Sequence, residues 1–305
     1  MKLTKALLVP VLLLAAQLSW AQRRWTLEEA SQDLIRLLRS LGQGDLQSSP
    51  GNWSEVREKG ITIVGSSPVC GSFQSSLSFA LGTWRITTEM GMGPKSDRRR
   101  PGQRHWQTAS EARKFIEQAL THTGPIGCLP RLDAFRYDDA PLGWGGNKVE
   151  ALTLSVKASF LMEGYPVDDS TVSAVFDGST GGLMSYSSRM PRKAVLVKAR
   201  PASQPTTEAQ ARAEAKAAGV SELVSAWNHS LKWVVEPPSS GGVSRRHGSR
   251  WLLAHVFKKP AAARPAGAPA DASQTPEVVV ESVPTGRIWS FATAASGAFE
   301  SRRRR

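Results

Sequence analysis

Three segments of the chain place apolar residues every three or four positions, which is the spacing of one face of an α-helix. Each segment opens with Thr-x-x-Glu/Gln-Ala, at Thr26, Thr108 and Thr207. In such a capping box the Thr hydroxyl accepts from an orphan backbone N–H, and the Glu or Gln side chain bonds back to the cap. A glycine that could end the helix follows each segment: Gly42, Gly124 and Gly219. The pattern predicts three capped helices.

After each predicted helix the apolar spacing changes to two, the period of a half-buried β-strand. Residues 83–88, for example, alternate Trp84 and Ile86 with polar side chains. Antiparallel strands of this kind must bury one face, and an amphipathic helix is a suitable cover. We therefore predict an α+β fold of repeated small units, each with one helix packed on a three- to four-stranded antiparallel sheet.

The limits of the predicted units follow from where the periodic segments start and stop. The units are expected over residues 25–90, 107–198 and 206–295. Residues 91–106 are rich in Gly, Pro and Arg and predict a basic linker. Residues 260–277 are rich in Pro and Ala and predict a disordered insertion in the third unit, and residues 296–305 predict an unstructured basic tail.

The N-terminal 21 residues have the pattern of a secretory signal peptide. Lys2 and Lys5 precede an apolar stretch, and the small residues Ser19 and Ala21 precede the expected cleavage near Ala21. The stretch is shorter than a helix needs to span a bilayer. We expect a secreted protein or one of the periplasm or cell envelope; the alternative is an uncleaved N-terminal anchor.

The formal net charge of +13 is partly clustered in arginine runs that end at Arg100, Arg250 and Arg305. Such runs attract anionic polymers or a membrane surface through general electrostatics. The alternative is that they are solvated loops. Aromatic residues do not interleave with the runs in the way that binding of single-stranded nucleic acid requires, so no specific nucleic-acid partner is expected.

Residues able to do chemistry are present, but no catalytic motif joins them. The five histidines form no His-Glu-x-x-His motif, and Gly-x-Ser-x-Gly is absent. His255 lies in an apolar run and is expected to pack within a strand. In an oxidising compartment Cys70 and Cys128 could form a disulfide, or they could be two independent buried thiols. We predict no catalytic residue, metal ligand or cofactor; a site that pairs Cys70 or Cys128 with His122 is the alternative.

Two hairpins carry a family resemblance. Asp177, Thr180 and Gly181 form an Asp-x-x-Thr-Gly turn between hydrophobic runs, and the set Glu281, Thr285 and Gly286 forms a looser version. With a preceding helix, this pattern resembles the PepSY domain family, most clearly in residues 107–190. The carboxylate, hydroxyl and glycine have a structural role, because glycine permits a positive φ and the oxygens can accept from turn N–H groups.

The resemblance implies a non-enzymatic, exported protein with tandem PepSY-like domains. Domains of that family occur in cell-envelope proteins and in propeptides, where they restrain proteases. The leading hypothesis is that the chain binds or restrains another envelope or secreted protein. The alternatives are a basic surface protein that binds anionic polymers or a membrane surface, and a hydrolase with an unrecognised site.

Overall fold

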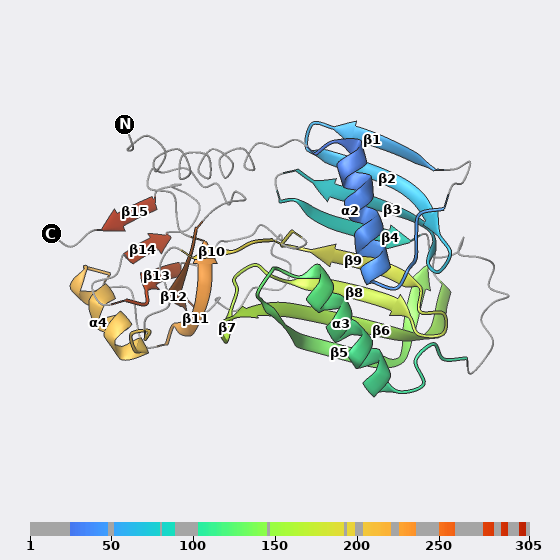
Figure 1. Cartoon of the computed structure of the whole chain (residues 1–305). Coiled ribbons are helices and arrows are strands. Elements are labelled where there is room, and N and C mark those ends of the chain that lie inside the picture. The colour runs from blue at the N-terminus through green and yellow to red at the C-terminus, as the bar shows by residue number, and fades with distance from the viewer. Residues whose placement is uncertain are drawn as a thin grey trace, which may run out of the picture. The chain divides into compact units, whose positions relative to one another are not determined.

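The computed structural model describes residues 25–47, 52–79, 81–88, 103–144, 147–191, 194–198, 204–220, 226–235, 250–259, 277–283, 288–291 and 299–302. In these residues the chain is α+β, with three helices and two sheets (Figure 1). It divides into two compact units: one holds the described residues of 25–163 and 169–196, the other those of 164–168 and 197–302. The expected signal peptide (1–21), most of the linker and nearly all of the insertion lie outside the described residues.

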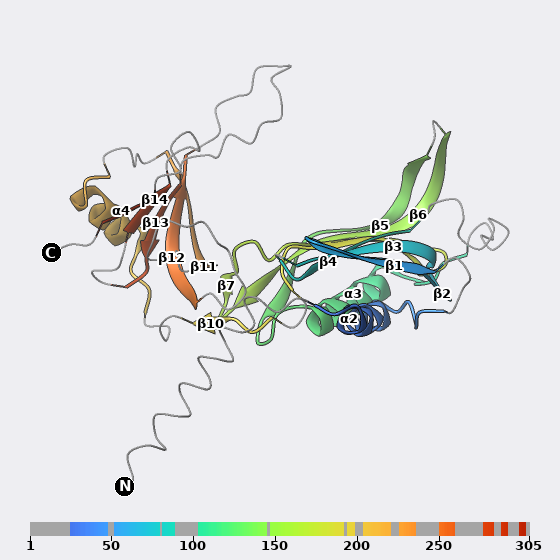
Figure 2. The same cartoon turned by 90° about the horizontal axis from the view of Figure 1, so that it is seen from above.

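The first unit is built on a large antiparallel sheet with the strand order β1-β2-β3-β4-β9-β8-β6-β5. The strands are β1 (Trp53–Arg57), β2 (Gly60–Ser67), β3 (Gly71–Ser78), β4 (Thr83–Thr88), β5 (Leu129–Trp144), β6 (Asn147–Met162), β8 (Val172–Asp177) and β9 (Leu183–Ser188). Helices α2 (Leu27–Ser40) and α3 (Ala109–Thr123) lie on the same face of this sheet (Figure 2). The opposite face carries no helix among the described elements.

The three predicted helices are confirmed, and their caps explain where they begin. Thr26 and Thr207 make complete capping boxes. Thr108 accepts from the Glu111 N–H, but the Glu111 carboxylate accepts from the Gln107 N–H, one residue earlier than in a capping box. Each helix buries a narrow apolar stripe, and in α2 the buried residues are Ala30, Leu34, Leu37 and Leu38.

The structure corrects the expectation that the first two predicted units have separate sheets. β4, from residues 25–90, pairs with β9, from residues 107–198, through the register Arg85↔Ser187, Ile86↔Tyr186 and Thr87↔Ser185. Two separate sheets would each leave an edge strand with open backbone groups at this point, and pairing removes both edges. Residues 53–88 and 129–188 therefore form one continuous sheet.

Gln43 connects the loop after α2 to the turn between β8 and β9 from a fully buried position. Its side chain donates to the Gly181 carbonyl (3.1 Å) and to the Leu41 carbonyl (2.7 Å), and its Oε1 accepts from the Leu183 N–H (2.7 Å). The loop after α2 is thus hydrogen-bonded to the turn between β8 and β9.

The second unit has one helix, α4 (Glu208–Ala217), and a smaller sheet. The strands of this smaller sheet are β10 (Val197–Lys198), β11 (Asn228–Val235), β12 (Arg250–Lys258), β13 (Glu277–Glu281), β14 (Ile288–Phe291) and β15 (Phe299–Arg302), whereas β7 (Tyr165–Pro166) pairs with β6 of the large sheet. β12 lies between β11 on one side and β13 on the other, and its pairing with β10 is parallel. The small face of α4, Ala211 and Ala215, packs in a cluster with Phe257, Val278 and Val280.

Two segments that were expected to lack structure take part in the fold. Trp106, at the end of the predicted linker, is buried and contacts Phe115 and Phe176. Phe299–Arg302, in the predicted tail, pairs with β14 as β15. In both cases the composition of the segment is basic and polar, and it does not indicate that Trp106 packs against aromatic rings or that residues 299–302 pair with a strand.

None of the described helices combines the length and the apolar character that crossing a membrane requires.

Candidate functional site

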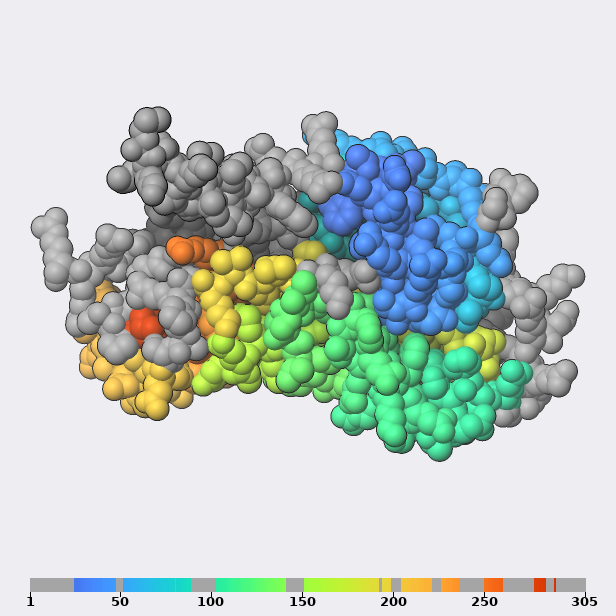
Figure 3. Space-filling view, in the orientation of Figure 1, coloured from blue at the N-terminus to red at the C-terminus, as the bar shows by residue number. Residues whose placement is uncertain are grey.

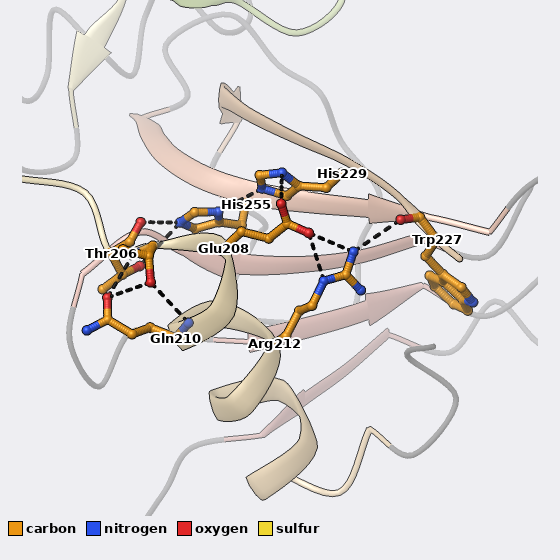
Figure 4. Close-up of polar contacts among 8 residues, drawn as sticks. Thr206, Glu208, Gln210, Arg212, Trp227, His229 and His255 are labelled. Carbon is orange, nitrogen blue, oxygen red and sulfur yellow. Dashed lines mark hydrogen bonds and ion pairs between the residues drawn. The ribbon is translucent and has the colours of Figure 1, made fainter. Parts of the chain in front are cut away.

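One connected group of titratable side chains lies in the second unit, where the start of α4 meets β11 and β12 (Figure 4). Glu208 is the first residue of α4, His229 lies on β11 and His255 lies on β12. In the register of the two strands His229 is opposite Phe257 and His255 is opposite Leu231, so the histidines are diagonal neighbours on one face.

The contacts of the two imidazoles form one chain. His229 Nδ1 lies 3.0 Å from Glu208 Oε2, and His229 Nε2 lies 2.9 Å from His255 Nδ1. His255 Nε2 lies 2.8 Å from the backbone carbonyl of Thr206, the residue before the cap of α4. The two rings stack with their centroids 5.1 Å apart. The chain therefore joins the start of α4 to both strands.

Arg212 completes the network on the next turn of α4. Its guanidinium donates to Glu208 (2.8 Å) and to the Trp227 carbonyl (3.2 Å), and it lies over the Phe257 ring at 4.6 Å. The hydrogen bond from Arg212 is the main reason why the pKa of Glu208 lies below its ordinary value. Glu208 is therefore an anion at neutral pH.

Burial is the main influence on both histidines and lowers the pKa of each. For His255, which is 2% exposed, the hydrogen bond with the Thr206 carbonyl opposes this effect and the facing His229 reinforces it. For His229 the Glu208 carboxylate opposes it and Arg212 reinforces it. Both rings therefore take up protons less readily than an exposed histidine does.

The Asp-x-x-Thr-Gly turn has the predicted local geometry in its first copy. Asp177 Oδ1 accepts from the Ser179 N–H (2.8 Å), and Thr180 Oγ1 accepts from the Gly182 N–H (3.2 Å). Gly181 has a φ of 75°. In the second copy Glu281 is buried in β13, while Thr285 and Gly286 lie outside the described residues. These hydrogen bonds lie within the turn, so its carboxylate and hydroxyl have a structural role.

The structure does not bring the two cysteines together. Both are buried as thiols, with no disulfide between them. Cys70 lies at the β2–β3 turn, beside Gly182, whereas Cys128 precedes β5 at the other end of the sheet.

The residues of the alternative catalytic pair differ in exposure, because His122 is exposed whereas Cys70 and Cys128 are buried. His122 Nδ1 lies 2.7 Å from the Gln118 carbonyl of its own helix, so this ring is used locally. Asp168 and Asp169 diverge, since Asp168 pairs with Lys232 and Asp169 with Arg189. Among the described residues no group of three or more His, Cys, Asp or Glu side chains could hold a metal ion.

Side chains on the uncovered face of the large sheet are mainly hydroxyls and cations. These residues alternate with the buried ones that face α2 and α3, and none of them is buried: Thr62, Ser76, Thr87, Ser155, Ser173, Ser185, Ser187, Arg85, Arg136 and Lys157. The register places Arg85, Ser187, Ser173 and Lys157 in one row across β4, β9, β8 and β6. The face is polar, and the carboxylates of Glu55 and Asp138, neither of which is buried, lie on it together with these cations.

One edge of the same sheet exposes apolar side chains. Among the described strands β1 pairs only with β2, and it leaves Trp53 49% and Val56 56% exposed. Because successive side chains of a strand alternate between faces, Trp53 and Val56 lie on opposite sides of β1. The edge therefore offers backbone hydrogen-bonding groups flanked by an apolar side chain on each face.

The sequence predicted that His255 packs in a strand, which is confirmed, but not that it pairs with His229. A signal exists, because both histidines lie in strand-like runs of the same predicted unit. Their pairing depends on the register between β11 and β12, and a long connection does not fix register in the way that a tight turn does. The apolar exposure of β1 was likewise not visible in its sequence.

Comparisons with known proteins leave the family of the chain open. No family model and no curated protein matches the sequence. Among solved structures, the chain is similar to the Bacillus megaterium YpeB C-terminal domain, with a TM-score of 0.31 and 8% identity over 92% of this chain and 100% of that chain. A likeness of this size supports no assignment of fold or function. The PepSY resemblance therefore rests on the residues of the sequence.

Proposed function

We propose that the chain is an exported, non-enzymatic protein that binds an extended segment of another protein by strand addition at β1. In strand addition a peptide pairs with the open edge of a sheet, the backbone hydrogen bonds supply affinity, and side-chain contacts on the two faces supply selectivity. The observation that carries the proposal is the exposed β1 edge with Trp53 and Val56 on its two faces.

Natural proteins usually protect edge strands, because an open edge invites pairing with other chains. β1 carries one such device, the ion pair between Glu55 and Arg57. Its two exposed apolar side chains, in contrast, favour association with another chain at this edge. An edge that is partly guarded but apolar on both faces suits selective pairing with one partner segment.

PepSY-like character is part of the same proposal. Each of the three helices begins at a threonine cap and is followed by antiparallel strands, and the Asp177 turn closes a hairpin that packs under α3. We infer that the segments over residues 25–90, 107–198 and 206–295 are kindred modules, of which the first two have joined their sheets. Export after a cleaved signal peptide and a role in restraining the bound protein belong to the same inference.

A displayed library of random ten-residue peptides tests the proposal. Selected peptides are expected to bind the chain and to slow amide deuterium exchange of residues 53–57. Val56→Lys places a charge at the edge and is expected to weaken binding at least tenfold. Val195→Lys makes the same change at a valine that is 69% exposed, outside β1, and should leave binding unchanged. Equal effects of the two variants, or peptide protection elsewhere than in β1, would contradict strand addition.

A second function is favoured by the uncovered face of the large sheet. Arg85, Arg136 and Lys157 are exposed there among hydroxyl side chains, which suits an anionic polymer. Binding of inorganic polyphosphate should then weaken steeply with salt and fall in Arg85→Gln. Arg36→Gln, on the exposed side of α2, is the matched control. Binding that is indifferent to salt, or equally affected by both variants, would exclude this role.

A further inference from the structure

Every second residue of β1 points its backbone hydrogen-bonding groups outward from the edge of the large sheet. β1 and β2 are joined by a two-residue turn, and the residues that flank such a turn, Arg57 and Gly60, bond to each other. Residues that bond to the neighbouring strand alternate with outward-pointing ones along an antiparallel pair. The N–H and C=O groups of Ser54 and Val56 therefore point away from β2.

This alternation limits how a second copy of β1 can pair with the first. An antiparallel partner has to place its own outward-pointing residue opposite Ser54 or Val56, so the pairing is centred on one residue and not between two. Centring on Glu55 or on Arg57 sets like charges directly opposite each other, which is destabilising. Centring on Trp53 or on Ser54 brings no opposite charges together. The register centred on Val56 remains.

With Val56 at the centre, the charges of β1 are complementary to themselves. Glu55 of each copy lies opposite Arg57 of the other copy, on the face of the sheet opposite the described helices. Within one copy Arg57 Nη2 already lies 2.7 Å from Glu55 Oε2. The four side chains of the pair of strands therefore alternate in sign, and each carboxylate lies between two guanidiniums.

The helix-covered face leaves room for the second strand beside β1. Val56 shares this face with the buried Ile61 of β2, yet Val56 is 56% exposed, so α2 does not cover the edge. β1 lies at the upper margin of the first unit in the space-filling view (Figure 3). In the Val56-centred register the two valines lie side by side and remove apolar surface of each other from water.

We propose that β1 is self-complementary: two copies of the chain pair antiparallel about Val56, and this self-association closes the edge that a partner segment would use. The same patch serves both copies, so the contact closes after two chains. The inference rests on the proposed strand addition, because both need β1 to be open for pairing. It adds regulation to that site, since self-association and peptide binding exclude each other at β1.

Charge exchange tests the register, with sedimentation of the whole chain over a concentration series up to about 1 mM as the assay. Glu55→Arg and Arg57→Glu, each alone, set like charges opposite each other at two symmetric positions. Each should weaken self-association by about tenfold or more, because like charges across strands repel. The double variant Glu55→Arg/Arg57→Glu restores the alternation and should dimerise about as well as the unmodified chain. Glu117→Arg makes the same change at a glutamate of α3 that also pairs with an arginine, and it should have no effect.

A chain that stays monomeric throughout the series, or a double variant that dimerises no better than the single ones, would overturn self-pairing. Peptide binding is scored separately, by the peptide-dependent protection of residues 53–57. Such protection in a chain that never dimerises would leave strand addition standing without self-pairing, and a dimer whose β1 accepts no peptide at any dilution would do the reverse. If both occur, the peptide should dissociate the dimer; a dimer that binds peptide at β1 without dissociating would overturn the closure of the edge.

Discussion

Replacing Gln43 by leucine is expected to destabilise the connection between the loop after α2 and the turn between β8 and β9. The side chain is 0% exposed and satisfies three backbone groups, of which the Gly181 carbonyl and the Leu183 N–H belong to the turn between β8 and β9. Leucine has a similar size but no polar atom. The variant therefore leaves these groups buried without their partner while keeping most of the packing.

The size of the effect follows from the groups that are left unsatisfied. A buried donor or acceptor without a partner costs about 1–3 kcal/mol. The Leu183 N–H can make only one hydrogen bond, so its loss should cost the full free energy of an unsatisfied donor. A carbonyl oxygen has a second lone pair that can still accept, so the loss at Gly181 should cost less. We expect a loss of about 2–4 kcal/mol, which is a shift of about 1–2 M in the urea midpoint.

Urea unfolding followed by deuterium exchange and mass spectrometry measures this effect region by region. Peptides from both 27–43 and 172–188 should lose protection together, because Gln43 hydrogen-bonds the loop after α2 to Gly181 and Leu183. Gln32→Leu makes the same change on the exposed side of α2 and should alter stability by no more than about 0.5 kcal/mol. A midpoint shift in Gln43→Leu equal to that of Gln32→Leu, or a change confined to residues 27–43, would refute the reasoning.

Three further predictions concern local features. Gly181→Ala should lower the free energy of unfolding in urea by about 2–4 kcal/mol, and Gly127→Ala by only about 1 kcal/mol. Both glycines have a positive φ, but only at Gly181 would the new Cβ contact a ring, that of His105, at 2.6 Å. Thr207→Ala should lower the helicity of α4 and cost about 1 kcal/mol, and a matching loss in Thr207→Ser, which keeps the hydroxyl, would argue against the cap. Burial raises the pKa of the Cys70 thiol, so iodoacetamide at pH 7.5 should modify it only in urea; rapid labelling of the native chain would show that the thiol is accessible.

Local elements of this fold could be predicted from the sequence because their causes are local. Thr26, Thr108 and Thr207 mark helix starts through hydrogen bonds within three residues. The turn at Asp177 follows in the same way from a carboxylate that accepts from the next N–H groups along the chain. Such signals depend on spacing alone and not on the rest of the molecule.

Long-range features were not predictable, because backbone geometry and not side-chain type determines them. The pairing of β4 with β9 uses main-chain groups that every residue has, so the strand sequences do not indicate that two sheets become one. The contact of Gln43 with Gly181 spans 138 positions, and the His229–His255 contact depends on strand register. The candidate site could therefore be found only once the strands were placed.

A structure of the chain with a selected peptide tests the central proposal most directly. Strand addition predicts that the peptide lies alongside β1, hydrogen-bonded to its backbone, with side chains against Trp53 on one face and Val56 on the other. A complex in which the peptide lies on another surface, and the outer edge of β1 stays open, would contradict it.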